Sequence, residues 1–223
     1  ILLRSGVITL KEYVGLLTDD IYRYESTPGR FVQSVEESSF DAWVKLYRQN
    51  ENSSNTMISY YLKGSLIALA LDLSIRNLTD SKSSFDDVFR ILWSNYKETN
   101  QGFTEDEFIS ICQQVSGNDL NDIWNLVRST DELDLNTCLS MVGLEIEKKY
   151  KKNPKKQLAS IGVNFKKNKL FIYSVLSNSP AEKYGLNAND ELIAINGIRL
   201  SSTNIVERLQ TLEINKSAEF TIS

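Results

Sequence analysis

The chain changes its sequence pattern near residue 145, and this change limits the folds that it can adopt. Residues 1–144 place apolar side chains at spacings of three and four, the period of an α-helix, whereas residues 157–223 contain short apolar runs typical of strands. The formal charge changes with the pattern, from −9 before residue 145 to +5 from there on. The sequence therefore predicts two domains, an all-α helical domain over 1–150 and a smaller α+β domain over 151–223.

The absence of histidine excludes several kinds of catalysis. None of the 223 residues is histidine, so the chain cannot build a Ser-His-Asp or Cys-His site or an H-E-x-x-H zinc site. Its two cysteines, Cys112 and Cys138, are too few for a structural zinc site and are expected to be ordinary buried thiols. We expect no metal site and no cofactor in this chain, and no enzymatic activity from it alone.

Charge and hydropathy argue against nucleic-acid and membrane partners. The net charge is −4, which gives no general attraction to nucleic acid, and the lysine-rich stretch 145–157 is interpreted as a solvated linker. The longest apolar run, residues 64–71, is shorter than the roughly 20 residues needed to cross a bilayer. The chain begins at Ile1, so a signal peptide further upstream would not be visible. Localisation is undetermined from the sequence, and the cytoplasm is favoured.

Capping patterns predict where the helices of the first half begin. Thr9 with Glu12 and Thr104 with Glu107 have the spacing of a capping box, and Ser84 begins a similar pattern. A stretch at 38–48 has an apolar face that is expected to be core, made of Phe40, Trp43, Val44 and Tyr47. A stretch at 57–78 is apolar nearly all round, which predicts a buried helix. The predicted helices cover about 9–24, 38–48, 57–78, 84–96, 104–115, 119–128 and 135–150.

The second half resembles a PDZ domain. Residues 179–197 resemble the pattern S-P-A-x-x-x-G-L-x-x-x-D-x-I-x-x-I-N-G of that family without a break in spacing, with Leu192 at its first isoleucine. Strands are predicted at about 162–165, 170–175, 191–195 and 218–222, with a one-turn helix at 179–185 and a second helix at 204–212. The resemblance covers residues 157–223, is of the circularly permuted bacterial type, and is expected to be truncated at the last strand.

The PDZ resemblance implies a peptide-binding site. In that family the amides of a glycine-containing loop bind a peptide's terminal carboxylate, and Ser160, Ile161, Gly162 and Val163 match this loop. Ile205 and Leu209 lie on one face of the later helix and would line the side-chain groove. A PDZ fold kept only for packing, or one that regulates the rest of the protein by gating its cleft, remains open at this point.

The first half resembles the glycyl aminopeptidase family of zinc metallopeptidases. The resemblance rests on S-Y-Y-L-K-G-S-L at 59–66, L-D-L-S-I-R at 71–76 and shorter matches such as P-G-R at 28–30 and F-D-A-W at 40–43. Members join a thermolysin-like catalytic domain to a PDZ domain, in the order seen here. The family's H-E-x-x-H helix and its zinc-binding glutamate precede this stretch. We therefore expect a carboxyl-terminal fragment whose partner is the missing amino-terminal part of its own catalytic domain.

One catalytic side chain is expected in this fragment. Residues 61–64 read Y-L-K-G, which resembles a Y-x-K-G motif whose tyrosine hydrogen-bonds the oxyanion during peptide hydrolysis. A phenol with a pKa near 10 remains a donor at pH 7, and such a donor is typically worth about 3 kcal/mol to the transition state. Tyr61 is the predicted oxyanion stabiliser and Tyr60 is its competitor, since adjacent helical side chains leave the axis about 100° apart. Arg76 is expected to pair with Asp72, four residues earlier, and Arg30 is given no role.

The resemblance implies a function for the whole parent protein. It would be a zinc metallo-aminopeptidase that removes amino-terminal residues from peptides, with small residues such as glycine preferred. The parent would hold zinc, whereas this chain would not. Its partners would be peptide substrates and peptide carboxyl termini. The alternative is a non-catalytic adaptor, in which a helical scaffold displays a peptide-binding PDZ domain.

Overall fold

The computed structural model describes residues 2–148, 159–166 and 170–223, and its contacts divide the chain into two compact units. Unit 1 consists of residues 1–42 and 58–146, and unit 2 consists of 43–57 and 147–223. The second unit thus includes a short excursion from the helical half. The predicted domain boundary at residue 150 and most of the lysine-rich stretch 145–157 lie outside the described residues.

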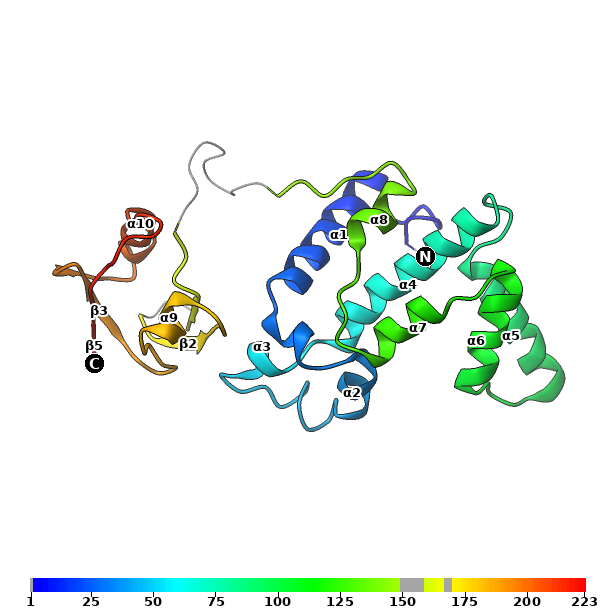
Figure 1. Cartoon of the computed structure of the whole chain (residues 1–223), viewed down its shortest axis with the longest axis horizontal. Helices are drawn as coiled ribbons and strands as arrows, with labels where there is room; N and C mark the ends of the chain where they lie inside the picture. Colours follow the sequence, from blue (N-terminus) through cyan, green and yellow to red (C-terminus); the bar gives the residue numbers. More distant parts are fainter. Residues whose placement is uncertain (1, 149–158, 167–169) are drawn as a thin grey trace. The chain divides into compact units, whose positions relative to one another are not determined.

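Unit 1 is built from helices only, among the residues described. They pack around one central helix, α4, which lies beside α1, α7 and α8 in Figure 1. The elements are α1 (Leu10–Glu25), the 3-10 helix η1 (Pro28–Phe31), α2 (Val35–Phe40), α4 (Tyr60–Leu78), α5 (Phe85–Thr99), α6 (Glu105–Ser116), α7 (Asn121–Arg128) and α8 (Leu135–Ser140).

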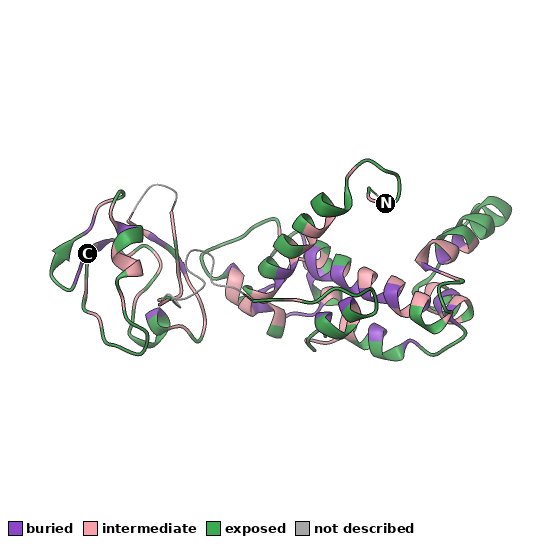
Figure 2. Ribbon diagram, turned by 90° about the horizontal axis from the view of Figure 1, so that it is seen from above, coloured by how far each residue is buried: buried purple, intermediate pink, exposed green. Residues whose placement is uncertain are grey.

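Helix α4 supplies much of the core, as its all-round apolar sequence predicts. It contacts α1, α2, α5, α6, α7 and α8, and its side chains Leu66, Ile67, Leu71 and Ile75 are each at most 4% exposed. In Figure 2, where buried residues are purple, they gather between the packed helices of unit 1. The segment Ser53–Leu78 is long and apolar enough to cross a membrane, but half of its most apolar window is buried inside the protein. Packing against six neighbouring helices accounts for that apolarity.

Side-chain caps fix several helix starts where the sequence predicts them. Reciprocal capping boxes join Thr9 to Glu12 and Thr104 to Glu107, and a further one begins at Ser84. Each cap satisfies amide groups that have no partner inside the helix. At the other end, Asn100 and Gly117 adopt left-handed conformations that terminate α5 and α6.

Two predicted helices differ in the structure. The helix expected at 38–48 is wrong: α2 begins at the capping box of Ser34 and Glu37 and ends at Phe40, and the next residues form turns. Its supposed core face is exposed, with Phe40 at 90% and Trp43 at 79%. The helix expected at 135–150 ends at Ser140, because Gly143 takes a φ of +71° in the turn that follows.

Unit 2 contains the strands and helices predicted for 157–223 in the predicted order, together with a short strand that was not predicted, β4 (Ile198–Arg199). The strands β1 and β2 form an antiparallel pair, and β3 lies between β4 and β5 in a three-stranded antiparallel sheet. Ile172, Leu192 and Ile195 form its core. The elements are α3 (Ser53–Thr56), β1 (Val163–Phe165), β2 (Ile172–Val175), α9 (Pro180–Lys183), β3 (Leu192–Ile195), β4 (Ile198–Arg199), α10 (Ile205–Gln210) and β5 (Phe220–Ile222).

Asn55 connects the 43–57 segment to the rest of unit 2. Its side-chain amide donates a 2.8 Å hydrogen bond to the carbonyl of Val175, and its oxygen accepts a 2.8 Å bond from the N–H of Ser177. One side chain thus pairs with a donor and an acceptor of the backbone at the end of β2, as a neighbouring strand would. This pairing explains why a segment 120 residues away in sequence belongs to unit 2.

Candidate functional site

The two candidate tyrosines lie at the first turn of α4, immediately after its N-cap Ser59. Tyr61 is 60% exposed, and Tyr60 is partly buried. Their rings lie 4.1 Å apart between centroids and are tilted by 31°. Although adjacent helical residues diverge by about 100°, these long side chains bend toward each other. The Tyr61 ring is therefore accessible on a helix that supplies much of the core.

Lys63, in the same turn, is buried rather than available to a substrate. Its side chain is 0% exposed, and its Nζ donates to the carbonyls of Ser129 at 3.4 Å and Asp131 at 3.2 Å, just after the end of α7. Burial lowers the pKa of the Lys63 amine, and the nearby carboxylates of Asp131 and Glu132 oppose that shift. Lys63 thus ties the first turn of α4 to the loop that follows α7.

The two arginines considered in the sequence have structural partners. Arg76 Nε lies 3.0 Å from Asp72 Oδ2, which confirms the predicted pair along α4. The other Asp72 oxygen accepts a 2.9 Å bond from the N–H of Phe85 at the start of α5. Arg30 Nε lies 2.9 Å from Glu132 Oε1, and its guanidinium lies over the Phe31 ring. Neither arginine is placed beside Tyr61 by these contacts.

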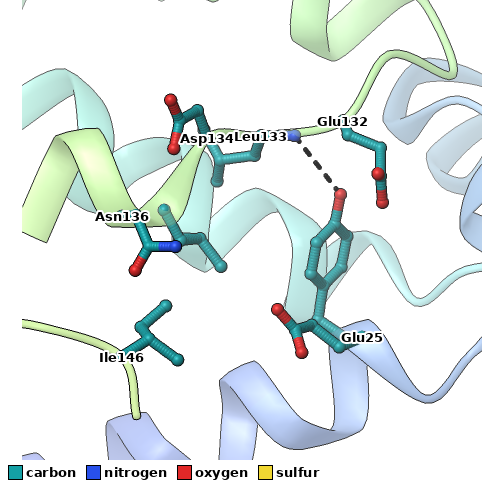
Figure 3. A pocket seen from close by; sticks show the side chains of 8 residues that line it. Glu25, Glu132, Leu133, Asp134, Asn136 and Ile146 are labelled. Carbon is teal, nitrogen blue, oxygen red and sulfur yellow. Dashed lines mark hydrogen bonds between the residues drawn. The ribbon is translucent and has the colours of Figure 1, made fainter. Parts of the chain in front are cut away.

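A pocket of about 290 Å³ in unit 1 lies between the end of α1 and the start of α8 (Figure 3). Three carboxylates line it. Glu132 pairs with Arg30, and Asp134 caps α8 by accepting bonds from Thr137. The hydrogen bonds from Thr137 lower the pKa of Asp134. The buried Tyr24 hydroxyl accepts the N–H of Leu133 at 3.5 Å. Glu132, Asp134 and Tyr24 in the pocket wall thus make contacts that stabilise the fold.

The predicted carboxylate-binding loop of unit 2 has a backbone that only glycine can supply at residue 162. Gly162 has a φ of +78°, and a Cβ placed there would lie 2.1 Å from the Cβ of Ser179. Its carbonyl accepts from Leu176 N–H at 2.8 Å, and the carbonyl of Ile161 accepts from Ala181 N–H at 2.9 Å. Among the described residues, none accepts a hydrogen bond from the amides of Ile161 and Gly162. The loop carbonyls are therefore held by backbone hydrogen bonds, whereas the N–H groups of Ile161 and Gly162 remain able to donate to a ligand.

The residues predicted for the groove lie close to the core of unit 2. Val163 in β1 pairs with Val175 in β2, and among the described residues the other edge of β1 has no strand beside it. Ile205 at the start of α10 is 8% exposed, and Leu209 packs against the same core cluster as Val163. Ser160 is exposed at the entrance of the loop. The loop, the strand edge and α10 thus belong to one small domain.

The side chains of this chain do not fit a catalytic zinc ion. The sequence offers no histidine, and the described residues contain no group of three or more Cys, Asp or Glu side chains close enough to hold a metal. Both cysteines are free thiols, and burial raises the pKa of Cys112 to about 12, so it is not a ready thiolate ligand. Within the part of the chain that the structure describes, no set of three such ligands for a zinc ion is therefore found.

Comparison with known proteins agrees with the sequence. Residues 1–67 match the M61 glycyl aminopeptidase family, and residues 141–219 match the PDZ domain family. The resemblance to the glycyl aminopeptidases is confirmed. So is the predicted fold class, a helical region followed by a PDZ domain. No curated protein matches the chain.

A solved structure extends the likeness over nearly the whole chain. A crystal structure of an aminopeptidase N family protein from Idiomarina loihiensis is similar with a TM-score of 0.90 and 31% sequence identity, over 99% of this chain. The match covers 40% of that protein. The chain thus spans less than half the length of this relative. Together with the family matches, this similarity supports the identification of the chain as part of a peptidase-family protein.

Buried polar side chains beside α4 were missed by the sequence reasoning. Gln33 and Ser38 are 3% and 2% exposed, and both bond the backbone of Ile58, the residue before the N-cap of α4. A Gln or Ser near a turn is normally solvated, so only the tertiary structure reveals these contacts.

Proposed function

We propose that this chain is part of a zinc metallo-aminopeptidase that removes amino-terminal residues, glycine among them, from peptides. The observation that carries the proposal is the exposure of Tyr61 at the first turn of the central helix α4, within a segment that matches the M61 family. A large aromatic side chain that is 60% exposed at this place is available to line a cleft with the remainder of the catalytic domain.

In this proposal Tyr61 acts as a hydrogen-bond donor. When the scissile carbonyl becomes tetrahedral, negative charge develops on its oxygen, and the phenol O–H donates to that oxygen. The bond is stronger in the transition state than in the ground state, so it raises kcat more than it lowers KM. Tyr60, whose ring touches that of Tyr61, is the competing donor.

Zinc would be held outside the present chain, because the side chains here do not fit it. In this class of enzyme a bound zinc ion activates water for attack on the peptide bond. The role of the present residues is limited to the oxyanion and to the support of the helix that carries Tyr61.

The PDZ domain is proposed to bind a peptide, either as substrate or as a regulator. The amides of Ile161 and Gly162 face no acceptor among the described residues, which suits them to a terminal carboxylate. The open edge of β1 suits the addition of a peptide strand.

The test uses the complete protein encoded by the gene together with residues 1–223 alone. The complete protein is expected to release the first residue from a glycyl peptide, to lose this activity with a metal chelator and to recover it with zinc. The 223-residue chain is the matched control and is expected to be inactive. Equal hydrolysis of the same peptide with an acetylated amino terminus, or activity indifferent to chelation, would contradict the proposal.

A further inference from the structure

We infer that Gln33 and Ser38 are positioning residues for the tyrosine pair, because they hold the peptide groups of Ile58 and so set the direction in which α4 begins. The inference rests on the proposed function, since it assigns these two side chains a part in placing the oxyanion donor. All the residues involved belong to unit 1.

Both backbone polar groups of Ile58, its N–H and its carbonyl, are hydrogen-bonded to side chains. The N–H of Ile58 donates to Gln33 Oε1 at 3.3 Å, and the hydroxyl of Ser38 donates to the carbonyl of Ile58. Ile58 itself is 1% exposed, so no water competes for these groups. Ile58 directly precedes the N-cap Ser59, and the tyrosines follow at the first two positions of the helix.

A third buried side chain fixes the other end of the same turn. Lys63 reaches the carbonyls of Ser129 and Asp131. The tyrosine pair is therefore bracketed between two points, Ile58 and Lys63, that are each fixed to a different part of unit 1. The backbone held at Ile58 and at Lys63 therefore sets where the Tyr60 and Tyr61 side chains leave the first turn of α4.

The burial of these polar groups argues for a positioning role beyond packing. Gln33 Nε2 is buried, and within the part of the chain that the structure describes it has no hydrogen-bond partner. A half-satisfied buried amide destabilises a fold, and an apolar side chain would fill the same space at lower cost. What an apolar side chain cannot supply is a directional bond to Ile58. Because a misplacement of about 1 Å can cost 100-fold in rate, such a bond matters for catalysis.

The test is a double-mutant cycle in the complete protein, with Ser38→Ala and Tyr61→Phe. Ser39→Ala is the matched control, since Ser39 is the exposed neighbour on the same helix α2 and both changes replace serine by alanine. Ser38→Ala is expected to lower kcat at least fivefold with KM within twofold, whereas Ser39→Ala leaves both within twofold. In the Tyr61→Phe background, Ser38→Ala is expected to change kcat by less than twofold, because the hydroxyl that it positions is gone.

The outcomes separate this inference from the proposed function. An inactive complete protein, or a Tyr61→Phe variant as active as wild type, would count against the proposed function. A Tyr61→Phe loss with no Ser38→Ala loss, or an equal Ser38→Ala loss in both backgrounds, would overturn the positioning role alone. Hydrogen exchange in the 223-residue chain tests the hydrogen bond from the Ile58 N–H to Gln33 without an activity measurement. Gln33→Met is expected to speed exchange of the Ile58 amide at least tenfold relative to Ser39→Ala, and unchanged exchange would overturn the inference.

Discussion

The two candidate sites of this chain differ in the groups that they offer: one offers a side chain and the other offers backbone amides. In unit 1 the candidate group is a side-chain hydroxyl on Tyr61, placed by buried side chains that bond the backbone around it. In unit 2 the candidate groups are backbone amides of Ile161 and Gly162, placed by backbone hydrogen bonds and by a glycine conformation. A side-chain site is therefore lost when an atom is removed, whereas a backbone site is lost when an atom is added.

The largest effect is expected from Gly162→Ala. The new methyl group would overlap Ser179, and a φ of +78° is strained for alanine, so unit 2 is expected to lose roughly 3 kcal/mol of stability. Gly185→Ala is the matched control, because Gly185 has a φ of +84° with nothing within 4 Å of the added Cβ, and about 1 kcal/mol is expected there. Hydrogen exchange of β3 amides measures both.

A thiol readout shows whether the damage stays in unit 2. Both cysteines lie in unit 1, and Cys112 is fully buried, so its reaction with a thiol reagent requires unit 1 to open. Gly162→Ala is expected to leave the labelling rate of Cys112 unchanged. If Gly162→Ala and Gly185→Ala lower the stability of unit 2 equally, Ser179 does not crowd residue 162.

The carboxylate preference of the loop is the next largest effect. A peptide with a free carboxyl terminus is expected to bind the chain at least tenfold more tightly than its amidated form, since only the carboxylate gains charge-assisted bonds from the amides. Isothermal titration of both peptides measures the ratio. Equal affinities would show that these amides do not capture a terminal carboxylate.

Asn55 offers a smaller effect that sharpens the boundary between the units. Asn55→Ala removes the bonds to Val175 and Ser177 and is expected to destabilise unit 2 by about 1 kcal/mol, with faster exchange of the Ser177 amide. Asn55→Asp keeps the acceptor and is expected to retain protection of Ser177. If the alanine variant also leaves the Ser177 amide protected, the 43–57 segment is not held by this side chain.

The smallest effect is expected from Arg76→Gln. The pair with Asp72 lies along one helix and is partly exposed, so its loss is expected to change stability by less than about 0.5 kcal/mol. In the complete protein, kcat and KM are expected to stay within twofold. A tenfold rise in KM would instead place Arg76 on the substrate.

Local signals in the sequence were sufficient for much of the fold. Capping patterns at Thr9, Ser84 and Thr104 predicted helix starts because those contacts join residues three apart. The prediction over 38–48 failed because it relied on apolar spacing, while the actual start is set by Ser34 and Glu37 upstream. The spacing of apolar residues is the same whether the face that they form is exposed to solvent, as here, or buried in a core.

The supports of the candidate site could not be predicted in this way. Tyr61 and Gly162 were found because each sits in a short motif. The bonds from Gln33 and Ser38 to Ile58 join residues 20 or more positions apart, and the bonds of Asn55 span about 120. No periodicity or local spacing records contacts of that kind, so only the tertiary structure shows them.

The most direct measurement of the central claim is the kcat of the complete protein with Tyr61→Phe and with Tyr60→Phe on a glycyl peptide. If the Tyr61 hydroxyl donates to the oxyanion, Tyr61→Phe lowers kcat at least tenfold with little change in KM, and Tyr60→Phe leaves kcat within threefold. Wild-type turnover by the Tyr61→Phe enzyme would contradict the account.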